Sequence, residues 1–112
     1  MYSIVSSVDA NEIILPTTIQ LNNENVETPT LLDSGAGGIF LDQNYARKLK
    51  VKEITLTTPI VARNVDGTPN KKGTIRSYVN LQFKIGDKSF YERFYITGLG
   101  KQKMILGLPW LK

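Results

Sequence analysis

The sequence predicts an all-β domain with one short helix, because apolar alternation and regularly placed turns account for most of its 112 residues. The clearest period of two runs over residues 75–85, where one face is apolar and the other polar. Turn-forming residues at 22–25 and 86–88 separate runs of strand-forming residues. Repeats and low-complexity segments are lacking, so we expect a single domain over residues 1–112.

The first hairpin is predicted in the amino-terminal third. Residues 12–21 are rich in Ile, Leu and Thr, as β-strands are, and the polar residues 22–25 supply the turn. The chain returns from Val26 and ends in an apolar run directly before Asp33. The hairpin therefore leads to a carboxylate that begins a Ser-Gly turn.

A short helix and a second hairpin are expected further along the chain. Asp42 is a suitable N-cap for residues 43–49, and basic residues near the end of this segment suit the negative helix terminus. The alternating strand 75–85 is followed by the turn 86–88 and by an aromatic-rich strand over 90–96. These two strands should pair, with one face buried and the other in water.

The composition limits the chemistry that the chain can perform. It contains no His and no Cys, which excludes a Ser-His-Asp triad, a cysteine nucleophile and the usual zinc sites. Carboxylates remain as the acid-base groups, and we expect neither a metal nor a cofactor. No apolar run approaches the ~20 residues that span a bilayer, and the amino terminus does not resemble a signal peptide. We therefore expect an intracellular, cytoplasmic protein without membrane association.

The net charge of +4 raises the question of nucleic-acid binding. Basic residues are spread along the chain, without interleaved aromatic residues or a known binding module. A solvated basic surface is the more economical interpretation, so the sequence predicts no nucleic-acid partner.

Three blocks of residues carry the most specific signal, in this order along the chain. They are Leu32-Asp33-Ser34-Gly35-Ala36 with Ile39-Phe40-Leu41-Asp42 after it, Asn64-Val65-Asp66-Gly67 up to Gly73-Thr74-Ile75, and Met104-Ile105-Leu106-Gly107-Leu108-Pro109-Trp110-Leu111. An Asp-Ser-Gly tripeptide alone often marks only an Asx turn. Together, however, the blocks resemble retroviral-type aspartic proteases, and most closely those of Ty3/gypsy long-terminal-repeat retrotransposons.

This resemblance implies a retropepsin-like closed barrel that is active as a two-fold homodimer. Pepsin-like chemistry needs two carboxylates, and the chain holds a single Asp-Ser/Thr-Gly, so the second must come from another copy. The terminal strands of family members often interleave at the dimer interface. Either the natural chain therefore continues past Lys112, or dimerisation relies on the strand over residues 2–8 and on the loops near the axis.

The resemblance also assigns roles to individual residues. Asp33 would be the catalytic acid, Ser34 would brace the loop across the dimer axis, and Gly35 would leave room for the substrate backbone. Gly107 would be a steric requirement beside this loop. Ala36 would lie beneath a substrate subsite, and Ile105 would form an apolar wall of the binding site with Ile39, Val61 and Leu108. Further substrate contacts are implied for a flap that closes over extended peptide and contains Val65, Asp66 and Gly67.

The leading functional hypothesis is an aspartic endopeptidase that matures a Gag-Pol-type polyprotein of a retroelement, so its partners would be a second copy and a peptide substrate. Two alternatives stay open. One is a non-catalytic peptide-binding or dimerisation module, against which the intact Asp33-Ser34-Gly35 argues. The other is a domesticated cellular protease of the ubiquitin-shuttle type.

Overall fold

The strands and the helix follow the expected order along the chain. The computed structural model describes residues 2–3, 13–33, 36–63 and 74–107. Its elements are β1 (Tyr2–Ser3), β2 (Ile13–Gln20), β3 (Asn25–Leu32), β4 (Ile39–Asp42), α1 (Gln43–Leu49), β5 (Ile54–Ile60), β6 (Ala62–Arg63), β7 (Ile75–Ile85), β8 (Lys88–Thr97) and β9 (Met104–Leu106).

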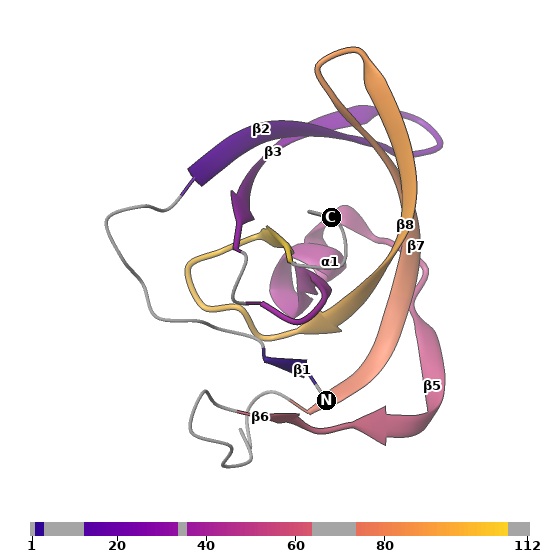
Figure 1. The fold of residues 1–112 in the computed structure, drawn as a ribbon. Helices are drawn as coiled ribbons and strands as arrows, with labels where there is room; N and C mark the ends of the chain where they lie inside the picture. The colour runs from indigo at the N-terminus through magenta and orange to yellow at the C-terminus, as the bar shows by residue number, and fades with distance from the viewer. Residues whose placement is uncertain (1, 4–12, 34–35, 64–73, 108–112) are drawn as a thin grey trace.

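Six of these strands close into a barrel (Figure 1). They neighbour one another in the order β2-β3-β9-β4-β8-β7, and β7 pairs back with β2 through Thr18↔Lys84 and the two following pairs. The strand β5 is attached outside the ring, along the first half of β7. The short β1 and β6 form a parallel pair of their own. The predicted all-β class and the closed barrel are confirmed.

Both predicted hairpins form. The pairs from Ile13↔Leu32 to Gln20↔Asn25 join β2 and β3. The pairs from Ser77↔Ile96 to Ile85↔Lys88 join β7 and β8. Gly86 in the second turn has φ +61°, a left-handed conformation that costs glycine little.

The helix α1 begins and ends where the capping pattern predicts. One Asp42 carboxylate oxygen, Oδ2, accepts the amide N–H groups of Asn44 and Tyr45, both at 3.1 Å. At the other end Lys50 is left-handed, with φ 59°, and its N–H returns to the last carbonyls. Within the described ranges, no helix is long and apolar enough to cross a membrane.

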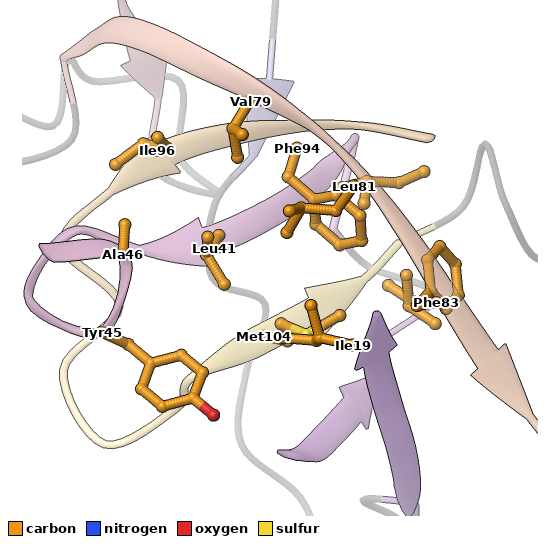
Figure 2. Packing of buried hydrophobic residues seen from close by; sticks show 12 residues of the cluster. Ile19, Leu41, Tyr45, Ala46, Val79, Leu81, Phe83, Phe94, Ile96 and Met104 are labelled. Atoms are coloured by element: carbon orange, nitrogen blue, oxygen red, sulfur yellow. The ribbon is translucent and has the colours of Figure 1, made fainter. Parts of the chain in front are cut away.

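The main hydrophobic core fills the barrel. Figure 2 shows side chains from β2, β4, β7, β8, β9 and α1 converging there. Phe83 is fully buried in this core, stacked on Phe90 at 5.3 Å and edge-on to Phe94 at 5.5 Å between ring centroids. The predicted apolar face of β7 supplies much of this core through Val79, Leu81 and Phe83.

A second apolar cluster lies apart from the first. It unites residues that sequence places far apart, and its buried members are Leu31, Ala36, Phe40, Ile75, Leu99 and Ile105. Leu56 and Ile60 of β5 pack against it, as does Tyr95 of β8. Because Leu31 and Ala36 flank Asp33 in the chain, this cluster supports the segment that carries the carboxylate.

Candidate active site

Asp33 lies directly after β3, at the start of a loop that is tied to β9. Its backbone N–H donates to the carbonyl oxygen of Leu106 at 3.1 Å. Its own carbonyl accepts the N–H of Ala36 at 3.0 Å. The residue as a whole is half-buried. The backbone of Asp33 is thus held on both sides while the residue retains access to solvent.

The strand β9 fixes both ends of this loop. It runs parallel to β3 through Leu31↔Ile105 and Leu32↔Leu106, and antiparallel to β4 through Ile39↔Leu106. The chain therefore leaves one edge of β9 at Asp33 and returns along the other edge at Ile39. Since Leu106 pairs on both sides, a shift of β9 would move both ends of the loop together.

Gly107 supports the loop by having no side chain. A Cβ atom built on it would stand 2.1 Å from the carbonyl oxygen of Gly38 and 2.6 Å from that of Ala36. Real Cβ atoms essentially never come closer than 3.0 Å to another heavy atom, and these neighbours are backbone. The prediction that Gly107 is a steric requirement is confirmed.

Two of the predicted substrate-contact residues lie beneath the loop. Ala36 is fully buried and Ile105 is 2% exposed, and both belong to the second apolar cluster. Ile39, from the same predicted apolar wall, is also buried, whereas Val61 is 44% exposed. In the single chain, Ala36 and Ile105 support Asp33 from below, and their contact with substrate stays a prediction.

The remaining predicted site residues fall outside the described residues. These are Ser34, Gly35, Val65, Asp66 and Gly67, together with the block 108–111. The expected flap segment lies between β6 and β7 in the chain. Of the expected amino-terminal strand 2–8, the structure describes β1, which pairs with β6 and so lies beside the strand that precedes the flap segment.

Asp42 is a second carboxylate in this region of the chain, at the end of β4 away from the loop, and its contacts are structural. Besides capping α1 through Oδ2, it accepts the N–H of Leu99 at Oδ1, at 2.9 Å. The cap was predictable from sequence, but the contact to Leu99, 57 residues away, had no sequence signal. Both oxygens are engaged, so Asp42 anchors the β8–β9 connection rather than serving as an acid or base.

A polar pocket of about 380 Å³ lies between α1 and the start of β7. None of the predicted site residues lines it, and its carboxylate, Glu53, accepts the hydroxyl of Ser77 at 2.8 Å. No group of His, Cys, Asp and Glu side chains in the described ranges could hold a metal ion. Asp33 thus remains the candidate for acid-base chemistry.

Comparisons with known proteins bear on this geometry. The family model of the PEG10/RTL1 protease domain matches residues 29–112. The retroviral protease-like domain of Ddi1 from Leishmania major has a similar structure, with a TM-score of 0.60 and 16% identity over 91% of this chain and 74% of that one. The protein Lpg0085 of unknown function (DUF785) from Legionella pneumophila gives a TM-score of 0.50 and 20% identity over 84% of this chain and 79% of that one. At such identities the two structures show a shared fold. A search of curated protein sequences found no match.

Proposed function

Because this chain belongs to the PEG10/RTL1 family of retropepsin-like protease domains, we propose that it is an aspartic endopeptidase. The observation that carries the proposal is the placement of Asp33. Its backbone is tied to β9, its loop packs on Gly107, and the residue is half-buried rather than sealed in the core. A residue so placed has a fixed backbone and retains access to solvent, which supports a catalytic role.

The active unit of this proposal is a two-fold homodimer in which the two copies of Asp33 meet at the axis. Two carboxylates about 3 Å apart cannot both ionise cheaply, so they share one proton and titrate as a pair. The ionised member takes a proton from a bound water, which attacks the scissile carbonyl. The protonated member stabilises the developing oxyanion, and a proton passes to the leaving amine. No covalent intermediate with the enzyme forms.

The structure of the single chain supports the precision that this chemistry requires. A misplacement of about 1 Å at a reacting group can cost a hundredfold in rate. Three contacts of the loop oppose such a shift: the hydrogen bond from Asp33 to Leu106, the close packing of the loop backbone on Gly107, and the apolar residues beneath the loop. Bracing by Ser34 and clearance at Gly35 would complete the catalytic loop across the axis.

The proposed substrate is an extended peptide that is covered by the flap of Val65, Asp66 and Gly67. Apolar side chains on either side of the scissile bond would suit the apolar residues near the loop, Ile39 and Ile105 among them. The proposed role is the processing of a retroelement polyprotein, which the resemblance to Ty3/gypsy proteases and the match to the PEG10/RTL1 protease domain support. The structural likeness to a Ddi1 domain favours a second role for the same chemistry, that of a domesticated cellular protease.

The test is cleavage of a pooled peptide library at several enzyme concentrations. We expect activity per protomer to rise with concentration, and Asp33→Asn to lower it by at least about 100-fold. Asp87→Asn makes the same chemical change in the exposed β7–β8 turn and should keep full activity. Equal activity in the Asp33 variant and the wild type would refute the proposal. Absence of cleavage in both at high concentration would favour the non-catalytic peptide-binding module.

A further inference from the structure

The outer face of the β7–β8 hairpin carries side chains that have no part in the proposed proteolysis. Alternation along the two strands places one set of residues in the core and the other outside. The outer set consists of Arg76, Tyr78, Asn80, Gln82 and Lys84 from β7, and Ser89, Tyr91, Arg93, Tyr95 and Thr97 from β8. At the proximal end of this set, Thr97 is buried and Tyr95 packs against the second apolar cluster, so only the distal part of the face is open. Across these two fully described strands, the outer face contains three cations, three tyrosines and no carboxylate.

Aromatic and basic residues alternate along β8 at Tyr91, Arg93 and Tyr95, and strand pairing brings residues of β7 onto the same face. Tyr91 lies opposite Gln82, and Arg93 lies opposite Asn80, next to Tyr78 on the diagonal. The guanidinium carbon of Arg93 stands 4.0 Å from the centroid of the Tyr78 ring, which is a cation–π contact. Each tyrosine on the distal part of the face therefore has a basic or amide neighbour.

The most exposed aromatic side chain of this face is Tyr91, at 68%. Arg76 and Arg93 are exposed too, and Lys84 is half-buried. Figure 1 shows the hairpin extending past the rest of the barrel, so its outer face is open over the distal half. An aromatic ring left in water on a face with several cations has no evident role in the stability of the fold.

The charge of this face favours a polyanion. Glu92 pairs with Leu81 and so lies on the opposite, inward side of the hairpin. Glu27 of β3 lies on the outer side, opposite Thr18 of β2, and Thr18 in turn lies opposite Lys84 of β7. Glu27 and Lys84 are therefore two strand spacings, or about 10 Å, apart. Phosphates that follow the distal part of the hairpin would thus meet Lys84 and Arg93 without an intervening carboxylate, whereas Arg76 lines the polar pocket that also contains Glu53.

We propose that the outer face of the β7–β8 hairpin binds single-stranded RNA. Bases stack on Tyr91 and on the Tyr78–Arg93 pair, and the cations hold the phosphates. Exposed sheet faces with aromatic side chains bind unpaired bases in this way, because every base offers a flat face. The amide side chains of Asn80 and Gln82 lie between these aromatic groups and can pair with ribose 2′-hydroxyls, which favours RNA over DNA.

The test is fluorescence anisotropy of labelled oligouridylate of about twelve nucleotides with the whole chain at low salt. We expect binding that weakens with salt, with a log–log slope of about −1.4 if the two cations Lys84 and Arg93 release counterions. Tyr91→Ala should weaken binding about 5- to 100-fold, whereas Tyr91→Phe should keep it, because the ring is retained. Since proteolysis is not measured, failure here leaves the proposed function intact.

Matched charge reversals separate this face from general attraction to a basic protein. Lys84→Glu and Lys48→Glu change the net charge equally, but Lys48 is an exposed residue of α1. We expect Lys84→Glu to weaken binding several-fold more than Lys48→Glu. Equal effects of the two reversals, equally tight binding of an RNA duplex or of oligodeoxythymidylate, or no binding at low salt would each overturn the proposal.

Discussion

Gly107→Ala tests how the Asp33 loop is held. The added Cβ would stand 2.1 Å from the carbonyl oxygen of Gly38, whereas an ordinary contact needs at least 3.4 Å. That oxygen, or the strand that carries residue 107, must therefore retreat by about 1.3 Å. Overpacking of this kind costs about 1–3 kcal/mol of unfolding free energy. Because the displaced loop carries Asp33, a shift of about 1 Å should also lower kcat/KM by about 100-fold.

Two measurements separate these effects. Urea denaturation followed by circular dichroism gives the change in unfolding free energy, and peptide cleavage by the folded variant gives kcat/KM. Gly86→Ala is the control, because Gly86 has φ +61° but a Cβ added there would meet no atom within 4 Å. It should lose about 1 kcal/mol through backbone strain and remain active. If Gly107→Ala matched Gly86→Ala in both measurements, the steric account of the loop would be refuted.

Three further predictions concern other parts of the chain. Asp42→Ala removes the helix cap and leaves the Leu99 N–H without its acceptor. Urea denaturation should therefore show a loss of about 2–4 kcal/mol in the free energy of unfolding. A loss below about 0.5 kcal/mol would contradict the anchoring role of Asp42. Tyr45→Phe removes the buried 2.6 Å hydrogen bond to Thr28 and should lower the free energy of unfolding by about 1 kcal/mol. In a Thr28→Val background the same change should cost much less, because its partner is already absent. Additive losses in this double-mutant cycle would show that the two side chains are not coupled. Peptide hydrolysis should be fastest between acidic and near-neutral pH, because the shared proton is needed, and a rate still rising above about pH 9 would count against that mechanism.

The local parts of the fold were predictable because each has a local cause. The strand β7 coincides with the alternating segment 75–85, since one face of that segment is apolar throughout. The helix α1 coincides with residues 43–49, since Asp42 can satisfy its first amide groups and no other segment offers such a cap before a helical pattern. Turn residues determined both hairpins.

The long-range parts were not predictable from pattern alone. Nothing in residues 104–106 indicates that they lie between β3 and β4, about seventy residues earlier in the chain, because the pairing depends on closure of the whole barrel. The resemblance to a family indicated that Gly107 neighbours the Asp33 loop, but the backbone atoms of Gly38 and Ala36 that it meets are seen only in three dimensions.

Burial also separated residues that the sequence treats alike. The apolar residues Ile105 and Val61 were assigned to the same wall, yet the first is buried in the second apolar cluster and the second is 44% exposed. Likewise, the sequence scatters its basic residues, and the register of β7 with β8 puts Arg93 on Tyr78 and Lys84 on the same face. These cross-strand neighbours depend on the register of the two strands, because a one-residue slip would move the side chains of one strand to the opposite face of the sheet.

The most direct test of the central claim is to mix the wild-type chain with the Asp33→Asn variant after subunit exchange, at concentrations where dimers predominate. If each active site needs Asp33 from both copies, a fixed amount of wild type should lose about half of its activity when an equal amount of the variant is added, and progressively more with excess. Activity that is unchanged by any excess of the variant would show that one chain suffices, and it would contradict the shared-carboxylate mechanism.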